Sequence, residues 1–311
     1  MDFIHRIAPE LQEGFAGLPP LQLPEGLAAA RSSVPLPAES LEGVRITERV
    51  LSVPGAHPVP VRIYEPANRN EHALPALLWT HGGGYILGNP GGDDALCGRF
   101  VQAANCVIVS PDYRLAPEHP FPAAIEDSYA ALEWLAEAGN GLNIDRSRIA
   151  VGGASAGGGL AAALALMARD KGGPALCFQL PLYPMLDDRN LTPSSYEITH
   201  PVLWNRANNL TAWEMVLGGP AGGAEISPYA APARAEDLTG LPPAYICIGQ
   251  LDLFRDETLD YVTRLAQAGV DVEFHLYPGG YHGFEHVVPA AAVSRRAMQE
   301  YIHALAKALN S

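Results

Sequence analysis

The sequence is poor in cysteine, with four among 311 residues, and none of them forms a C-x-x-C pair. Cys106, Cys177 and Cys247 lie in apolar, strand-like runs, and Cys97 lies in a segment with a helical pattern. Such spacing provides neither a disulfide framework nor a set of zinc ligands. We therefore expect four buried thiols, a reducing compartment and no metal site.

Positive charge is also scarce, because 20 Lys and Arg stand against 34 Asp and Glu and give a net charge of −14. This surplus of negative charge repels phosphate backbones and anionic lipid, so we expect no nucleic-acid partner. Uninterrupted apolar runs long enough to cross a membrane are missing, and residues 1–6 do not begin a basic stretch with an apolar run behind it. We expect a soluble cytoplasmic protein with no membrane insertion.

Cofactor motifs are missing as well. The glycines at 152–159 fit neither the spacing of a phosphate-binding P-loop nor that of a dinucleotide-binding turn. We expect no cofactor.

Strand and helix patterns alternate along most of the chain. Residues 44–53 and 59–64 show strand periodicity around the turn residues 54–58, and short apolar runs then alternate with helical segments. This pattern predicts an α/β fold with a mostly parallel central sheet flanked by helices. The later strands are expected at 76–79, 106–109, 149–151, 176–180, 244–248 and 272–277, and helices at about 122–138, 156–170, 256–268 and 289–308.

Two segments fall outside this alternation. Residues 1–43 lack strand periodicity, and about sixty residues around 185–240 separate two strands that one helix would normally join. An insertion at that place would lie above the carboxyl ends of the strands, where open α/β sheets bind ligands. We expect a helical cap built from 1–43 and 185–240 on a catalytic domain of 44–311; a peripheral helical decoration is the alternative.

The pentapeptide 153–157 has the pattern G-x-S-x-G, with Ser155 at its centre, between an apolar run and an alanine-rich helical run. In a chain with 31 glycines this pattern also arises by chance. At a sharp turn from strand to helix, however, small neighbours allow a strained serine whose hydroxyl is exposed. The position therefore predicts that Ser155 is a nucleophile.

A serine nucleophile needs a base, and the base needs an acid that orients it. Asp252 follows the strand predicted at 244–248, and His282, with Gly280 and Gly283 near it, follows the last predicted strand. The chain order Ser, Asp, His is that of the α/β-hydrolase fold. Asp256 and Glu257 are alternative acids, although they fit better as first-turn acids of a helix.

Three glycines follow His81 directly after a predicted strand. Backbone N–H groups without side-chain obstruction can stabilise the negative charge that acyl transfer builds on a carbonyl oxygen. Gly83 and Gly84, together with the N–H of Ala156, would form an oxyanion hole with three donors. A glycine turn without function is the alternative, and His81 is expected to anchor the loop.

Together these stretches resemble the hormone-sensitive-lipase-like branch of the α/β-hydrolases, also called bacterial family IV esterases. The resemblance extends from about residue 45 to the end and includes 81–84, 112–124, 153–157, 252–257 and 281–284. It implies hydrolysis of carboxylic esters by Ser155, Asp252 and His282, with Gly83, Gly84 and Ala156 as oxyanion donors. It also implies a cap, and a homodimer through the strand at 272–277 as an alternative to a monomer.

Two details concern individual residues. Ala154 stands where the family usually carries Asp or Thr, and because a methyl group forms no hydrogen bond, we expect altered stability or rate with the nucleophile retained. The stretch from Asp112 is interpreted as a structural turn in which Arg114 pairs with Glu118.

The sequence thus predicts a metal-independent serine carboxylesterase that acts on small-molecule esters with short or medium acyl chains. A lipase, or a hydrolase of amides, lactones or acetylated sugars, would use the same groups. A non-catalytic ligand-binding module is the alternative from another class.

Overall fold

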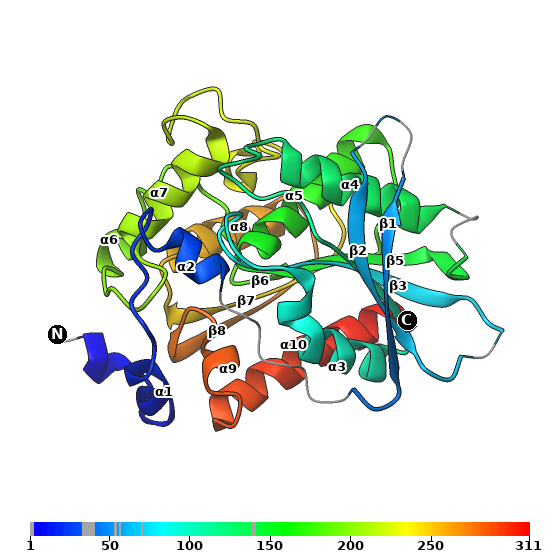
Figure 1. The fold of residues 1–311 in the computed structure, drawn as a ribbon, viewed down its shortest axis with the longest axis horizontal. Coiled ribbons are helices and arrows are strands. Elements are labelled where there is room, and N and C mark those ends of the chain that lie inside the picture. Colours follow the sequence, from blue (N-terminus) through cyan, green and yellow to red (C-terminus); the bar gives the residue numbers. More distant parts are fainter. Residues whose placement is uncertain (1–2, 33–40, 53–54, 56, 70, 138–140) are drawn as a thin grey trace.

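The computed structural model describes residues 3–32, 41–52, 55, 57–69, 71–137 and 141–311, so the turn predicted at 54–58 lies partly outside the described residues. Eight strands form one sheet in the order β1-β2-β4-β3-β5-β6-β7-β8 (Figure 1). β1 and β2 are antiparallel to their neighbours, and every pairing from β4 to β8 is parallel. The predicted mostly parallel α/β sheet is confirmed.

The strands are β1 (Val44–Leu51), β2 (Val59–Pro66), β3 (Leu74–Thr80), β4 (Val107–Pro111), β5 (Ile144–Ala154), β6 (Phe178–Leu182), β7 (Ala244–Leu251) and β8 (Val272–Tyr281). The α-helices are α1 (Gln12–Ala16), α2 (Leu27–Arg31), α3 (Asp94–Ala104), α4 (Ala123–Ala136), α5 (Ala156–Lys171), α6 (Pro193–Glu197), α7 (Arg206–Leu217), α8 (Arg255–Gln267), α9 (Phe284–Val287) and α10 (Ala292–Asn310). The described residues also include short 3-10 helices: η1 (Phe3–Arg6), η2 (Pro9–Leu11), η3 (Pro90–Asp93) and η4 (Pro232–Arg234).

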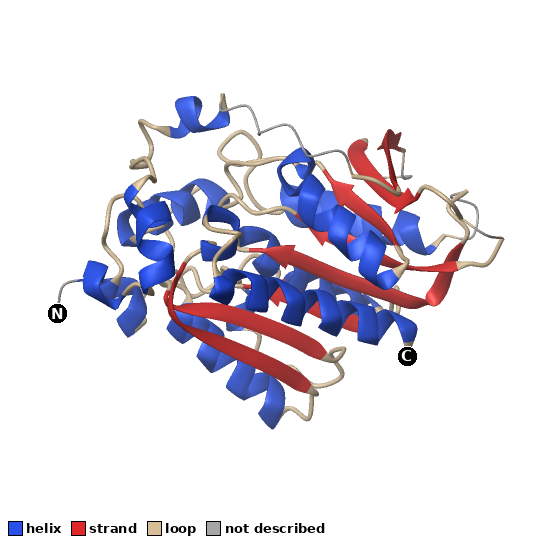
Figure 2. Ribbon diagram, turned by 90° about the horizontal axis from the view of Figure 1, so that it is seen from below, coloured by secondary structure: helices blue, strands red, loops and turns tan. Residues whose placement is uncertain are grey.

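Helices cover both faces of the sheet. α3 and α10 pack together on one face, and α4, α5 and α8 lie on the other (Figures 1 and 2). The central strands are therefore buried on both sides, and every residue of β3 is buried. This two-sided burial explains why these strands appear in the sequence as continuous apolar runs.

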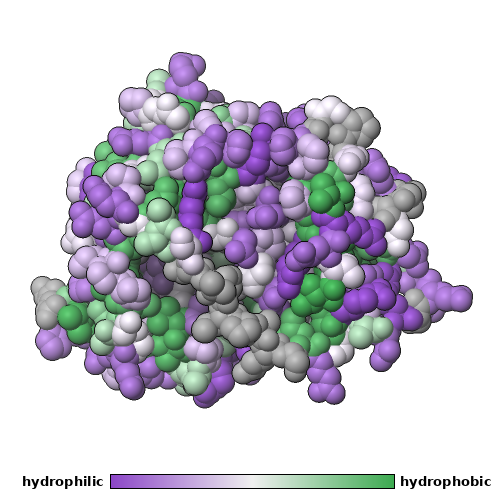
Figure 3. Space-filling view, in the orientation of Figure 1, coloured by the Kyte–Doolittle hydropathy of each residue, from purple (hydrophilic) through white to green (hydrophobic). Residues whose placement is uncertain are grey.

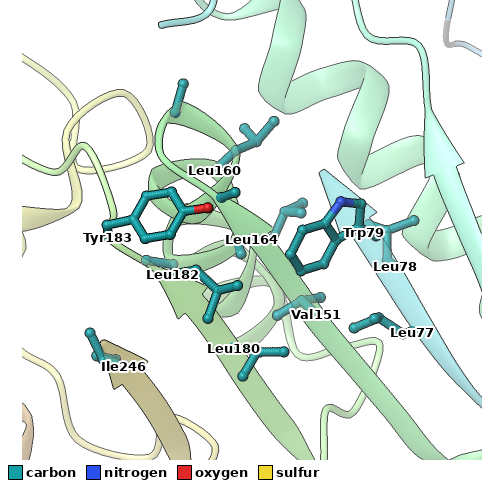
Figure 4. Packing of buried hydrophobic residues seen from close by; sticks show 14 of the residues in the cluster. Leu77, Leu78, Trp79, Val151, Leu160, Leu164, Leu180, Leu182, Tyr183 and Ile246 are labelled. Atoms are coloured by element: carbon teal, nitrogen blue, oxygen red, sulfur yellow. The ribbon is translucent and has the colours of Figure 1, made fainter. Parts of the chain in front are cut away.

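The core joins the alanine-rich helix α5 to the middle of the sheet. Leu160 and Leu164 of α5 pack with side chains of β3, β5, β6 and β7 (Figure 4). Each fully buried leucine contributes about 2 kcal/mol of hydrophobic free energy. This packing fixes the start of α5 against the ends of β5 and β6.

The cysteines agree only in part with the expectation. Cys97, Cys106 and Cys247 are buried, and burial raises the pKa of each thiol, that of Cys106 to about 12. Cys177 is half-buried, because it lies just before β6 rather than inside it. Among the described helices, none is both long and apolar enough to cross a bilayer.

The predicted pairing of Arg114 with Glu118 is wrong. Arg114 instead binds Asp127, a buried residue of α4, through its backbone N–H at 2.9 Å and its guanidinium at 2.7 Å. Glu118 accepts two hydrogen bonds from Arg31, at 2.7 and 3.0 Å. Each charged group has found a partner on another element, so the segment is tied to its neighbours rather than to itself.

The N-terminal segment lies against the insertion that follows β6. Leu21 donates its N–H to the carbonyl of Pro201 at 3.2 Å. Asn208 of α7 joins the two segments twice, because its side chain accepts from the N–H of Leu23 at 3.0 Å and donates to the carbonyl of Leu21 at 2.9 Å. Two segments far apart in the sequence therefore form one layer.

Candidate active site

Ser155 lies between the last residue of β5 and the first residue of α5, and its backbone has φ +58° and ψ −117°. This is a conformation that non-glycine residues rarely adopt and that persists only when neighbours hold it. The N–H of Ser155 donates to the carbonyl of Leu182 at 2.9 Å, and its carbonyl accepts from Met185 at 3.0 Å. The end of β6 and the loop after it thus hold the strained serine in place.

The glycines of the pentapeptide are required by close packing. A methyl group at Gly157 would lie 2.0 Å from the carbonyl oxygen of Thr80, and one at Gly153 would lie 2.3 Å from the carbonyl oxygen of Gly157. The Thr80 hydroxyl donates to the carbonyl of Gly157 at 2.7 Å. The end of β3 therefore fits closely against the turn, and only glycine fits there.

A hydrogen-bonded chain connects Ser155 with two residues from the ends of other strands. Nε2 of His282 lies 2.9 Å from Oγ of Ser155, and Nδ1 of the same ring lies 2.7 Å from Oδ2 of Asp252. Asp252 directly follows β7, and His282 directly follows β8. The three residues predicted from the sequence are thus brought together from positions 127 and 30 residues apart along the chain.

Asp252 and the aromatic rings fix the orientation of His282. Oδ1 of Asp252 accepts the N–H of Phe254 at 2.9 Å, which leaves Oδ2 for the imidazole. The rings of Tyr183 and Phe254 meet His282 edge-on, with centroids 5.1 and 5.3 Å away. A ring held in this way can accept the serine proton without a large change of geometry.

The electrostatic surroundings make His282 more basic. Burial lowers the pKa of its imidazole, but the adjacent carboxylate of Asp252, its hydrogen bond and the buried carboxylate of Glu285 outweigh burial and raise that pKa. Because these groups stabilise the protonated ring, the site favours a proton on His282 once the serine has lost it.

The glycine turn after β3 passes beside the serine. A methyl group at Gly82 would lie 3.6 Å from Cβ of Ser155. Gly83 and Gly84 have φ values of +117° and +62°, and methyl groups there would lie 2.2 Å from the carbonyl oxygen of Leu87 and 2.3 Å from the Trp204 ring. Ala156, the third predicted donor, is the first residue of α5, where a backbone N–H has no partner within the helix.

His81 lies behind this turn. Its ring stacks on Tyr113 with centroids 4.2 Å apart, its Nδ1 lies 2.8 Å from the carbonyl of Gly82, and burial lowers its pKa. These contacts fit the predicted role of a loop anchor.

A cavity of about 860 Å³ opens onto Ser155 and His282. Its walls include the glycine turn together with Arg31 of α2, Trp204 from the insertion and Tyr183. The sequence predicts an insertion at about 185–240, which includes Trp204, but it does not identify Trp204, Tyr183 or Arg31 as residues of the site. The closeness of Trp204 to Gly84 depends on how distant segments dock, and no local pattern reports it.

The alternative acids lie elsewhere. Asp256 accepts the N–H of Ser194 at 2.7 Å, and Glu257 accepts the N–H groups of Leu186 and Asp187 at 2.7 and 3.2 Å. Both are first-turn residues of α8, as expected, and both support the start of the insertion. Neither is hydrogen-bonded to His282.

Comparison with known proteins identifies the family of this chain. A family model described as alpha/beta hydrolase fold matches residues 77–286. Esterase LipI of Mycobacterium tuberculosis is 41% identical over 282 residues, which cover 87% of this chain and 86% of that protein. Carboxylesterase NlhH of the same species is 40% identical over 281 residues, covering 86% of both chains.

Solved structures agree with this result. A structure titled bacterial heroin esterase superposes with a TM-score of 0.91 at 38% identity, and the match covers 100% of both chains. Esterase LipW from Mycobacterium marinum superposes with a TM-score of 0.87 at 35% identity, covering 99% of this chain and 98% of that one. The chain belongs to the α/β-hydrolase fold family, in its hormone-sensitive-lipase-like branch of carboxylic ester hydrolases.

Proposed function

We propose that this chain is a serine carboxylesterase in which Ser155 is the nucleophile, His282 the general base and Asp252 the residue that orients it. The observation that carries the proposal is the continuous hydrogen-bond chain from Oγ of Ser155 through His282 to Asp252, at the wall of a cavity large enough for a small ester. Serine hydroxyls become effective nucleophiles when a base of this kind accepts their proton.

The reaction proceeds in two halves. Ser155 attacks the ester carbonyl while Nε2 of His282 accepts its proton, and Asp252 stabilises the imidazolium through Nδ1. His282 then protonates the departing alcohol and leaves an acyl group on Ser155. Water, deprotonated by the same imidazole, attacks the acyl group and releases the acid and the free serine.

The negative oxygen of both tetrahedral intermediates is assigned to the backbone N–H groups of Gly83, Gly84 and Ala156. The positive φ of both glycines and the closeness of their turn to Ser155 support this assignment. The N-terminus of α5 adds a favourable partial charge at Ala156. Loss of one such donor typically costs about 3 kcal/mol of transition-state stabilisation.

Short and medium acyl chains are the proposed substrates. The bulky rings of Trp204 and Tyr183 line the cavity together with Ser155 and leave less room for a long acyl chain. Hydrophobic residues form separate patches between hydrophilic ones on the face in Figure 3, and a lipase would need a broad apolar surface to bind an oil droplet. These features favour an esterase that acts on small soluble esters.

The segments 1–43 and 185–240 are proposed to act as the cap. Their described parts are joined through Asn208, and both contribute to the cavity wall, through Arg31 and Trp204. A role in admitting and sizing the substrate follows from this position.

The proposal includes a cytoplasmic protein that is a monomer or a homodimer and binds no nucleic acid. The four free cysteines suit a reducing compartment, and the net charge of −14 disfavours nucleic acid. β8 is the last strand of the sheet, so its outer edge offers a place for pairing between two copies.

The first test compares wild type with Ser155→Ala on p-nitrophenyl esters from acetyl to palmitoyl. We expect wild-type activity to peak at short or medium chains, and the variant to lose at least about a thousandfold in kcat. Ser52→Ala, at an exposed serine outside the cavity and the proposed cap, is the matched control and should keep full activity. Retained activity in Ser155→Ala would contradict the assignment, and a maximum on long-chain emulsions would favour a lipase.

A further inference from the structure

Two neighbouring carboxylates at the start of α3 have different surroundings. Asp94 is neutralised, because its oxygens accept hydrogen bonds from Arg62 at 2.7 and 2.8 Å and from the Tyr64 hydroxyl at 2.8 Å. Asp93 accepts only the indole N–H of Trp79, at 2.8 Å, through Oδ2. Within the described residues Asp93 forms no ion pair, and its Oδ1 has no hydrogen-bond partner.

Asp93 also does not cap the N-terminus of α3 with its side chain. It occupies the N-cap position of α3, where an aspartate side chain typically accepts a backbone N–H of the first turn, yet it forms no such bond. Its side chain is instead held by Trp79, whose ring is fully buried, and Asp93 lines the same cavity as Ser155. The protein thus fixes this carboxylate at the wall of the proposed active site.

Two other ionisable groups of the cavity are paired with carboxylates. Arg31 is neutralised by both oxygens of Glu118, and His282 is paired with Asp252. Burial lowers the pKa of His81, which favours its neutral form. Among the described residues that line this cavity, Asp93 is therefore the carboxylate that has no cationic partner.

A carboxylate without a cationic partner discriminates between ligands by their charge. It attracts a cationic group in the cavity and repels an anionic one, and both effects are stronger there than in bulk water because the surroundings are less polar. The net charge of −14 acts in the same direction.

We propose that Asp93 makes this cavity selective for esters that carry a protonated or quaternary amine, and disfavours esters that carry a carboxylate. This inference rests on the proposed esterase function. The indole N–H of Trp79 holds Oδ2, and Oδ1 faces the ammonium group. Asp93 is a specificity-determining residue and takes no part in the bond-breaking steps.

The test uses esters that differ in charge and little in shape. On the alcohol side, acetylcholine is compared with its neutral isostere 3,3-dimethylbutyl acetate. On the acyl side, p-nitrophenyl esters carrying a trimethylammonio, a tert-butyl or a carboxylate group at the end of the same short chain are compared. We expect wild type to prefer the cationic over the neutral ester about tenfold in kcat/KM on at least one side, and to disfavour the anionic one.

Asp93→Asn removes the charge and keeps an acceptor for Trp79. We expect the cation preference to fall to near one and the activity on the anionic ester to rise, with activity on the neutral ester within about twofold of wild type. Glu71→Gln makes the same change in net charge on an exposed loop residue outside the cavity and the proposed cap, and should leave the preference unchanged. An unaltered preference in Asp93→Asn, or a wild type without any preference, would overturn the proposal.

A second measurement needs only wild type. Choline should inhibit hydrolysis of p-nitrophenyl acetate competitively and about tenfold more strongly than 3,3-dimethylbutanol, and added salt should weaken this difference. Equal inhibition by the two alcohols, together with equal rates on the acyl-side esters, would contradict the inference even if Asp93→Asn did not fold. Failure of the esterase function itself would appear differently, as loss of activity on the neutral esters.

Discussion

The two sides of the cavity are built in different ways. On one side Ser155, Asp252 and His282 directly follow β5, β7 and β8, strands that are paired to parallel neighbours. On the other side α2 and the insertion provide Arg31 and Trp204, and both side chains are held by hydrogen bonds, Arg31 to the carbonyl of Ala116 and Trp204 to Asn209. The comparison indicates that the sheet sets the chemistry, whereas a few polar contacts set the access to it.

The polar attachment is concentrated at a few residues. The guanidinium of Arg31 donates to the carbonyls of Ile86 and Ala116 at 2.7 and 2.6 Å, besides its two bonds to Glu118. Further along, Arg6 pairs with Glu197 of α6. Contacts of this kind depend on each partner, whereas apolar packing is spread over many side chains.

The largest effect is expected from a change on the sheet side of the cavity, which is the side that carries the triad. Asp252→Asn should lower kcat about ten-thousandfold, because an amide cannot stabilise the imidazolium and favours the wrong tautomer of His282. Steady-state rates on p-nitrophenyl butyrate measure this change. Asp256→Asn is the matched control on the same segment, and its kcat should stay within about tenfold of wild type. A greater loss in Asp256→Asn than in Asp252→Asn would exchange their roles.

A smaller effect is expected on the attached side of the cavity, which is the side formed by α2 and the insertion. Arg31→Ala removes hydrogen bonds to two carbonyls and leaves Glu118 unpaired, so the wall formed by α2 should loosen. We expect KM to rise about fivefold and kcat to change less than twofold, because a charged hydrogen bond contributes about 1.5–3 kcal/mol and part of it is recovered by water. Arg45→Ala, at an exposed arginine of β1 that pairs with Glu65 outside the cavity, is the control and should leave both constants unchanged. A fall in kcat with constant KM would contradict the division between the two sides.

The smallest effect concerns the sheet side and is the dependence of kcat/KM on pH through His282. His282 must be neutral to accept a proton, and its pKa is raised above 6.5, so kcat/KM at pH 6.5 should be less than half of its plateau value. Because the folded-state pKa is the higher one, the stability that this group contributes is complete below pH 6.5 and is lost as the pH rises through the folded-state pKa. A pH profile of kcat/KM tests the first expectation, and an acidic limb below pH 6.5 would contradict it.

Much of the sheet side could be predicted from the sequence. Ser155, Asp252 and His282 each stand at the end of an apolar run, and parallel strands bring such ends to one edge. The start of β5 was missed, because polar residues such as Asp145 and Arg148 pair with each other on its exposed part. The catalytic roles of Ser155, Asp252 and His282 remain a proposal that the variants above test.

The attached side was predictable only as an insertion. The buried face of α7 includes Asn208 and Asn209 beside Trp213, so no apolar stripe marks it in the sequence. Arg31 was not identified because its partners lie 55 to 87 residues away. The mistaken pair of Arg114 and Glu118 has the same origin, since a charge in the sequence does not state which distant group it will meet.

The backbone of Ser155 has one further consequence. Its N–H is bonded to Leu182 and its carbonyl to Met185, and Met185 leads directly into the insertion that carries Trp204. A displacement of the insertion that moves Met185 would therefore disturb one of the hydrogen bonds that hold the strained serine. The segment that admits the substrate is thus coupled to the geometry of the nucleophile. A ligand that shifts this segment is therefore expected to change kcat without contacting the triad.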